Sequence, residues 1–423
     1  MIESLRIDPE AVRNDILRTA DFGMVDSEDG VARTVLPGTQ ANGRARTYLV
    51  DQMVAAGLEV TVDAVGNITG RWTPPNSDRT TSPVAAGSHL DSVPMGGIFD
   101  GPLGVYAALE AVRTIKDSAL SVRRPIDVVC FTGEEGTRFT DGVLGSSVAA
   151  GKLSVADALS LSDGEVTLET ALDEIGFRGE GRLDASNWAS WLELHVEQND
   201  VLERADEPVG VVTSITGTTR CHVQIDGEPD HAGTASMGDR TDALAAASEL
   251  VLALEAAANR IVAEESESAV ATVGSLSVSP GVVNVVPAGV ELEIDIRDVD
   301  GAMIERLVET VEDTCDSLRR ERGVDVTVER PYDIAPKSMA DSLRTALQRA
   351  ASAVDLEPPT LHSGAGHDTM EVAEVTDTGM LFARSRGGHS HSPLEYTNWL
   401  DCGVATQVLT LALAETAGVE QNL

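Results

Sequence analysis

Apolar and polar residues follow two periods along this chain, one typical of helices and one typical of strands. Apolar residues recur at helical spacing in some segments and alternate, or form short runs, in others. The predicted helices are 9–20, 41–56 and 102–116, and the predicted strands are 58–65, 84–86, 126–132, 191–198 and 379–383. Asp8 before Pro9 suits a helix N-cap. Alternation of helix and strand favours an α/β domain.

A different pattern occupies the middle of the chain. Strands are predicted at 211–226, 269–278, 289–297 and 324–329, and helices at 241–263 and 302–322. Four strands and two helices in this order are ferredoxin-like. We therefore predict an α/β domain formed by 1–210 and 331–423, interrupted by an α+β insertion over 211–330.

The charge balance excludes several classes of partner. The 423 residues include 69 Asp and Glu against 31 Lys and Arg, a formal net charge of −38, and only three residues are lysines. Such a chain repels nucleic acid and anionic membrane surfaces. Its acids are spread beside apolar periodicity, which favours a folded acidic surface over a disordered tail. The composition resembles that of cytosolic proteins of extreme halophiles, so we expect a halophilic protein.

The apolar runs, the N-terminus and the cysteines lead us to expect a cytoplasmic protein. No run of 18 apolar residues is present, and the N-terminus lacks the layout of a signal peptide. The four cysteines are far apart and form no CxxC pair, as is typical of reduced thiols.

The stretch from Gly87 to Val105 carries candidate chemistry. It follows a buried strand and contains His89, Asp91 and Asp100 among five glycines. Imidazole and carboxylate ligands suit Zn²⁺ and are accepted by Mn²⁺ or Co²⁺. An Asp-capped helix after a Gly-rich turn, with an incidental histidine, explains the same residues.

Other predicted strands also end in polar residues. Glu134 and Glu135 follow one strand, His195 lies in another, and His389 and His391 follow a third. Ligands of open α/β sheets bind beyond the carboxyl ends of strands, so these side chains are expected to lie at one edge. A structural role for each residue alone remains an alternative.

Arg297 in the insertion is a candidate carboxylate clamp, because a guanidinium can bind both oxygens of a carboxylate. A surface ion pair with Asp295 or Asp298 is the alternative.

Seven motifs together resemble the amidase/hydantoinase/carbamoylase family of dinuclear metal hydrolases, which is related to aminoacylases and carboxypeptidases. The motifs are GSHLDSVPMGGIFDGPLGV, GEEGTRF, ELHVEQ, HAGTASM with GDRTDA, NVVP with DIRD, SGAGHD and HSHSPLE. This resemblance implies a zinc-peptidase-like catalytic domain with a mixed sheet, and an inserted dimerisation or lid domain that forms a homodimer.

The resemblance also implies two divalent metal ions per subunit, either Zn²⁺ or Mn²⁺, Co²⁺ or Ni²⁺. Carried over motif by motif, His89 and His195 would bind one ion and Glu135 and His391 the other, with Asp100 bridging both.

Further roles follow from the same resemblance. Glu134 would be the general base, and Asp91 would orient the ring of His89. His231 of the partner subunit would lie at the oxyanion. The resemblance places four further residues at the substrate: Asn284 and Arg297 at its carboxylate, and Gln198 and His367 as additional contacts.

The expected activity is hydrolysis of a linear C–N amide bond in N-carbamoyl-L-amino acids. Allantoate amidohydrolase and β-ureidopropionase are alternatives, followed by an aminoacylase or peptidase and by a non-catalytic metal-binding protein. The chain departs from the family pattern at Asn199-Asp200 and at Ala235-Ser236, which weakens any choice of substrate side chain.

Overall fold

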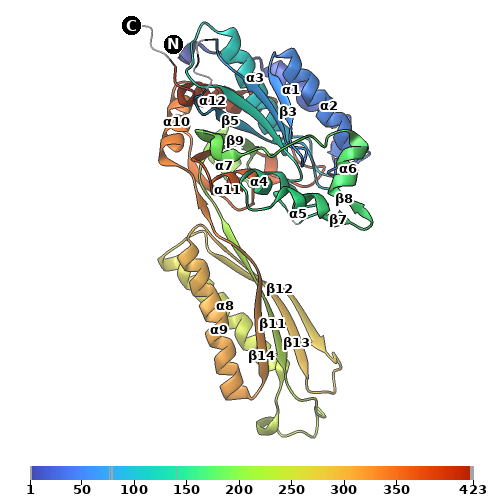
Figure 1. Cartoon of the computed structure of the whole chain (residues 1–423). Helices are drawn as coiled ribbons and strands as arrows, with labels where there is room; N and C mark the ends of the chain where they lie inside the picture. The colour runs from blue at the N-terminus through green and yellow to red at the C-terminus, as the bar shows by residue number, and fades with distance from the viewer. Residues whose placement is uncertain (1, 76, 78–79, 141, 420–423) are drawn as a thin grey trace. The chain divides into compact units, whose positions relative to one another are not determined.

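The structure is a computed structural model that describes residues 2–75, 77, 80–140 and 142–419. It has two compact units: one consists of Met1–Thr213 and Met339–Leu423, and the other is Ser214–Ser338 (Figure 1). The inserted unit extends beyond the predicted end at residue 330, because its last long strand, β14, continues to Ile334.

A nine-stranded mixed sheet forms the centre of the larger unit. Its order is β15 (Lys337–Ser338), β10 (Val209–Ile215), β17 (Thr378–Ala383), β9 (Ser190–Val196), β5 (Val84–His89), β6 (Ile126–Phe131), β4 (Ile68–Trp72) and β3 (Glu59–Val62), with β16 (Thr360–Ser363) beside β10. The strands β17, β9, β5 and β6 are parallel to one another. Their carboxyl ends therefore meet at one edge of the sheet, where ligands bind in open α/β folds.

Helices cover both faces of this sheet (Figure 1). One face is covered by α3 (Pro102–Asp117), α10 (Asp341–Ser352) and α12 (Trp399–Thr416), with α1 (Pro9–Ala20) outside them. The other face carries α4 (Leu144–Ala149) and α11 (Asp368–Val372), and α2 (Gln40–Ala55) packs on β3 and β4. Neighbouring residues of β5 point into different cores, since Val84 and Ala86 join one apolar cluster and Ala85 another. Burial on both faces explains the continuous apolar runs of the central strands.

Short elements complete the larger unit. They are β1 (Met24–Val25), β2 (Ala32–Arg33), β7 (Ser162–Asp163), β8 (Val166–Thr167), α5 (Val155–Ser160), α6 (Leu168–Ile175) and α7 (Val201–Ala205). The predicted strand 58–65 is shorter than expected: β3 ends at Val62, and the chain reverses through Gly66, with φ of +84°, into β4.

The inserted unit is a four-stranded antiparallel sheet with two long helices. The strand order is β12 (Val270–Ser279), β13 (Gly289–Asp298), β11 (Gly217–Asp226) and β14 (Asp325–Ile334), and α8 (Ala243–Glu264) and α9 (Gly301–Arg322) pack against it. The prediction of one strand over 211–226 is wrong. The chain breaks at Thr216, and β10 belongs to the nine-stranded sheet whereas β11 belongs to the insertion.

Within the described ranges, no helix is both long enough and apolar enough to cross a bilayer.

Candidate metal centre

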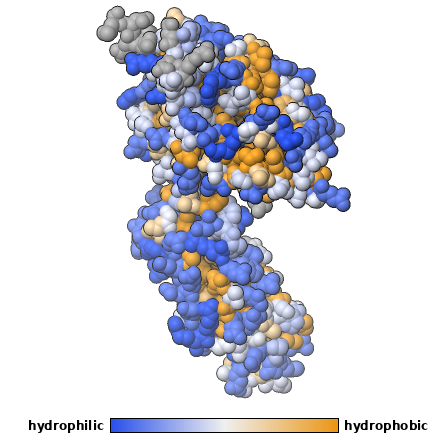
Figure 2. All heavy atoms as spheres, viewed as in Figure 1, coloured by the Kyte–Doolittle hydropathy of each residue, from blue (hydrophilic) through white to orange (hydrophobic). Residues whose placement is uncertain are grey.

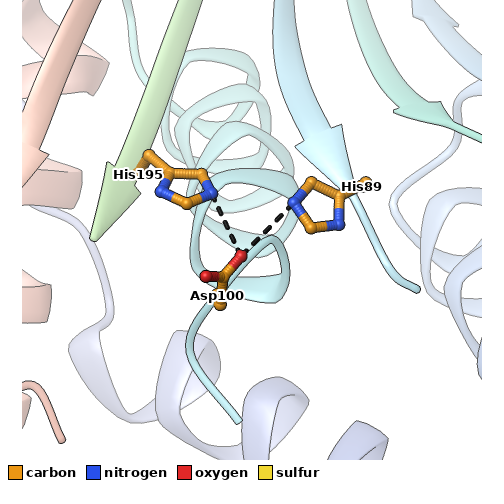
Figure 3. Close-up of side chains that lie close together, drawn as sticks. All are labelled: His89, Asp100 and His195. Atoms are coloured by element: carbon orange, nitrogen blue, oxygen red, sulfur yellow. Dashed lines mark ion pairs between the residues drawn. The ribbon is translucent and has the colours of Figure 1, made fainter. Parts of the chain in front are cut away.

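Two histidines and one aspartate converge at the carboxyl ends of β5 and β9 (Figure 3). Nε2 of His89 lies 3.4 Å from Oδ1 of Asp100, and Nε2 of His195 lies 3.2 Å from the same oxygen. All three side chains are buried. Gly101, with φ of +81°, turns the chain from Asp100 into α3, and a Cβ there would lie 2.6 Å from the ring of His89. Only glycine fits this conformation and this close approach.

The surroundings of the two rings suit a cation. Nδ1 of His89 lies 3.2 Å from the backbone oxygen of Asp91, and Nδ1 of His195 lies 3.0 Å from that of Val196. A proton on Nδ1 then leaves the lone pair on Nε2, the tautomer that metal-binding histidines adopt. Both Nε2 atoms are buried and have no hydrogen-bond partner within the described part of the chain. These donors therefore fit a divalent metal ion.

A second group of possible ligands shares Asp100. Nε2 of His391 lies 3.1 Å from Oε2 of Glu135 and 3.7 Å from Oδ2 of Asp100. Hydrogen bonding to Glu135 raises the pKa of His391 to about 9. The side chain of His391 is 51% exposed, and its backbone φ of +54° is rare for a residue with a side chain. The two oxygens of Asp100 thus face two different sets of donors.

Glu134 lies beside these groups but belongs to neither. Its Oε2 is 3.6 Å from Nε2 of His89. Burial raises the pKa of Glu134 well above its usual range; His89 lowers it, and Asp368 and Glu135 add to the increase. For His89, burial lowers the pKa, but the carboxylates of Glu134 and Asp100 raise it well above its ordinary value. Glu134 is therefore a buried carboxyl group that lies beside the two ligand groups without being a member of either.

Asp91 ties the ends of β5 and β6 together. Its carboxylate accepts hydrogen bonds from the backbone N–H groups of Gly133, Glu134 and Glu135, at 3.1, 3.4 and 3.2 Å. Its contact with Nδ1 of His89 is longer, at 3.8 Å, than that of its own backbone oxygen. The carboxylate therefore holds the turn that carries the two glutamates, in addition to lying behind the His89 ring.

Gln198 and His367 also face this centre. Nε2 of Gln198 donates to Oδ2 of Asp100 at 2.9 Å, while its buried Oε1 has no hydrogen-bond partner among the described residues. The ring of His367 meets that of His195 edge to face, with centroids 4.5 Å apart. Burial lowers the pKa of His367 well below its usual value, so the ring is neutral.

His231 and Asn284 lie together in the inserted unit. His231 forms an isolated antiparallel bridge with Val285, and the N–H of Ala232 donates to the backbone oxygen of Asn284 at 3.0 Å. Both residues are therefore at the end of the sheet where β13 begins.

Arg297 is at the opposite end of that sheet. It follows Gly289, the first residue of β13, by eight positions, which is about 26 Å along a strand. In this structure Arg297 donates to both carboxylate oxygens of Asp295, at 2.7 and 3.3 Å, so it forms the ion pair considered from the sequence. A single inserted unit thus does not bring Arg297 together with His231 and Asn284.

Sequence reasoning missed two residues that contact the loop between His89 and Asp100. Arg33 lies in the two-residue strand β2, whose surroundings carry no motif. Glu395 is part of the HSHSPLE motif, which was noted for its histidines only. The position of Glu395 inside that motif was the one available signal.

Comparison with known proteins agrees with this geometry. The profile of peptidase family M20/M25/M40 matches residues 85–415. An N-carbamoyl-L-amino acid amidohydrolase of Geobacillus stearothermophilus is 38% identical over 93% of this chain and 95% of its own. A ureidoglycolate hydrolase of Arabidopsis thaliana is 33% identical over 98% of this chain and 88% of its own.

Comparison with solved structures supports the same family relationship. A hydantoinase/carbamoylase family amidase from Burkholderia multivorans has a TM-score of 0.89 and 31% identity, covering 98% of this chain and 99% of its own. The chain therefore belongs to peptidase family M20/M25/M40 and, within it, to the hydantoinase/carbamoylase amidases.

Proposed function

We propose that this protein hydrolyses the linear C–N amide bond of N-carbamoyl-L-amino acids, releasing the amino acid, ammonia and carbon dioxide, with two divalent metal ions per subunit. The observation that carries the proposal is the sharing of Asp100 between two groups of ligands: His89 and His195, and Glu135 and His391. Its relatives named for this reaction, at 33–38% identity, support the choice of substrate class.

The proposed metal ligands are the residues that the family resemblance implies. When bound, two cations would polarise the substrate carbonyl and lower the pKa of water. Histidine and carboxylate ligands accept Zn²⁺, Mn²⁺, Co²⁺ or Ni²⁺, and availability often decides among these ions. The donor set therefore supports a dinuclear centre without selecting the metal.

Glu134 is the proposed general base. Its carboxylate would accept a proton from the attacking water and deliver it to the leaving nitrogen, since it is not itself a member of either ligand group. Two further groups offer contacts to a ureido group. Oε1 of Gln198 and Nδ1 of His367 are buried and have no hydrogen-bond partner among the described residues, and Oε1 can accept an N–H.

The substrate site is proposed to be shared by two chains. His231 would stabilise the oxyanion, and Asn284 and Arg297 would bind the substrate carboxylate. Because Arg297 lies about 26 Å along β13 from the end that carries the other two, a small substrate requires Arg297 from one subunit and His231 with Asn284 from its partner.

The edge strand β12 supports a homodimer through the inserted unit. Among the described residues, β12 pairs only with β13, and its ten residues include no charged side chain in a chain of net charge −38. On the face drawn in Figure 2, a narrow apolar streak runs along this unit between wider hydrophilic areas. Exposed edges are normally protected by charge or covered, so we propose that a second copy covers this edge.

Antiparallel pairing of two β12 edges about a twofold axis would also complete the site. Val270 of β12 is paired with Arg297, and Ser279 with Gly289 near Asn284. Reversal of the partner strand would set the Arg297 end of one chain beside the Asn284 end of the other.

The same chemistry also suits other ureido acids. Relatives named allantoate deiminase and ureidoglycolate hydrolase are 35% and 33% identical, so a ureido acid other than an N-carbamoyl amino acid is the second candidate. A β-ureidopropionase, an aminoacylase or peptidase, and a non-catalytic metal-binding protein follow.

A substrate panel tests the proposal. Ammonia release is measured in molar KCl with Mn²⁺, Co²⁺ or Zn²⁺ from several N-carbamoyl-L-amino acids, N-carbamoyl-β-alanine and allantoate, with acetate release from an N-acetyl amino acid measured in parallel. We expect turnover of N-carbamoyl-L-amino acids. Preferred turnover of another ureido acid would favour one of the alternative activities. Activity on the acetyl compound alone would indicate an aminoacylase. Lack of turnover of every compound would contradict an enzymatic role.

A further inference from the structure

We propose that Arg33 and Glu395 are positioning residues that shape the loop from Leu90 to Asp100 before any cation binds, and so set the direction of the Asp100 carboxylate. The inference rests on the proposed metal centre. It assigns a role to one residue near each end of the chain, and neither is among the proposed metal ligands or substrate contacts.

The buried guanidinium of Arg33 donates hydrogen bonds to four backbone oxygens of this loop. Its Nε donates to the backbone oxygen of Gly97 at 2.9 Å, and Nη1 donates to that of Leu90 at 2.9 Å. Nη2 donates to the backbone oxygens of Asp91 and Asp100, at 3.3 and 3.0 Å. The side chain is fully buried, so its planar set of N–H donors binds the loop and is not exposed to solvent. A lysine offers a single ammonium and cannot span these four carbonyl oxygens.

Glu395 binds the same loop through its N–H groups. Oε1 accepts from the backbone N–H of Phe99 at 2.8 Å and from that of Asp100 at 3.1 Å. Gly97 allows this approach, because a Cβ there would lie 2.2 Å from the carboxyl carbon of Glu395. Oε2 lies 3.3 Å from the hydroxyl oxygen of Ser390. Asp100 is therefore held at its N–H by Glu395 and at its carbonyl oxygen by Arg33.

The same network reaches the Asp100 side chain. The hydroxyl of Ser390 lies 2.7 Å from Oδ2 of Asp100, and Gln198 donates to that oxygen as well. Oδ2 is thus fixed while Oδ1 faces His89 and His195. Every contact is made within the protein, so none requires a cation. Burial lowers the pKa of the Arg33 guanidinium, and the negative charge of the nearby Glu395 carboxylate opposes this effect.

Amide hydrogen exchange of the wild-type protein tests whether the loop is formed in advance. With EDTA present, the Phe99 and Asp100 amides are expected to exchange as slowly as they do after Co²⁺ is added, because Glu395 accepts both. Fast exchange in EDTA that slows only when Co²⁺ is added would overturn the proposal. This measurement uses no substrate, so it stands apart from failure of the proposed reaction.

Variants test whether the two residues act through Asp100. Arg33→Lys and Glu395→Ala are expected to weaken Co²⁺ binding by about 10–100-fold and to lower kcat with little change in KM. If Asp100 is shared by two bound Co²⁺ ions, a change in the direction of its carboxylate would also weaken the spin coupling between them. Glu395→Gln retains the acceptor Oε1, so it is expected to recover most of the affinity lost in Glu395→Ala.

Arg46→Lys is the matched control for loss of a buried guanidinium. Arg46 is equally buried and donates to Asn42, to the backbone oxygen of Gly66 and to Thr132. It is expected to lower the melting temperature as Arg33→Lys does while leaving Co²⁺ affinity unchanged. Wild-type affinity and spin coupling in Arg33→Lys or Glu395→Ala would refute the positioning role. If Arg33→Lys does not fold, the proposal is tested by comparing Glu395→Ala with Glu395→Gln and by the exchange experiment.

Discussion

At the scale of single residues, the centre separates groups that suit metal binding from a group that suits proton transfer. Nε2 of His89 and Nε2 of His195 both face one oxygen of Asp100 and have no hydrogen-bond partner in the part of the chain that the structure describes, whereas Glu134 is outside both ligand groups. A metal site with a purely structural role has no need of an extra buried carboxyl group. Glu134, the proposed general base, is therefore the residue whose replacement is expected to separate catalysis from metal binding.

Glu134→Gln is expected to lower kcat by about 10²–10⁴-fold, because an amide cannot accept the proton of water. Metal content, measured by elemental analysis, should remain two ions per subunit. Glu165→Gln, at an exposed position, is the control and should leave both values unchanged. Loss of metal together with activity would contradict the assignment of Glu134 as base rather than ligand.

At the scale of elements, the centre depends on the junction between the loop and α3. Gly101 adopts a φ of +81° directly after Asp100, and its missing side chain leaves room for the ring of His89. The helix begins at Pro102, so the position of Asp100 is fixed by the start of a helix buried against the sheet. A change at this junction should disturb metal binding and stability together.

Gly101→Ala is expected to destabilise the protein by more than the approximately 1–2 kcal/mol that a left-handed residue costs, because the new methyl group would clash with His89. Gly176→Ala is the control: Gly176 has φ of +74° and open space around it. Thermal unfolding and Co²⁺ titration should show a stability loss in both variants and weaker metal binding in Gly101→Ala only. Equal metal affinity in the two variants would argue against this role for the junction.

At the scale of the whole molecule, two features concern more than one site. One is the division of the proposed substrate contacts between the two ends of the inserted sheet, and the other is the net charge. The sheet separates Arg297 from His231 and Asn284 by the length of β13. A shared site between two chains makes a quantitative prediction about mixed dimers.

Arg297→Ala and His231→Ala are each expected to inactivate the homodimer. Mixed and re-annealed, they should recover about one quarter of wild-type activity, since half of the dimers are mixed and each then has one intact site of two. A mixture that stays inactive, although light scattering shows dimers, would indicate that each site is built from a single chain. Mixing each variant with itself is the control.

The net charge of −38 predicts dependence on salt. Self-repulsion acts over about 10 Å at 0.1 M salt and about 3 Å at 1 M, so the melting temperature is expected to rise with KCl. Sucrose at equal osmolality, which does not screen charge, is the control. A melting temperature that is the same in dilute buffer and in molar KCl would contradict a halophilic character.

Much of this arrangement could be predicted from the sequence because it rests on local patterns. The helix at Pro9–Ala20 has the predicted ends, since Asp8 accepts from the N–H of Glu10 as an N-cap. Apolar runs predicted the strands that became β5 and β9, although the first was expected to end at residue 86 and in the structure continues to His89. Alternation continued through Thr216, so the pattern could not show that β10 and β11 belong to different sheets.

The sequence by itself determined the class of fold, the family and the candidate ligands, because periodicity and motif spacing are properties of neighbouring residues. Only the tertiary structure decided that Arg33 and Glu395, 362 positions apart, bind one loop. It also separated Arg297 from Asn284, which are only 13 residues apart in the chain. Hydrogen bonds of a buried guanidinium and the length of an extended strand depend on where distant segments pack, and no local pattern encodes that.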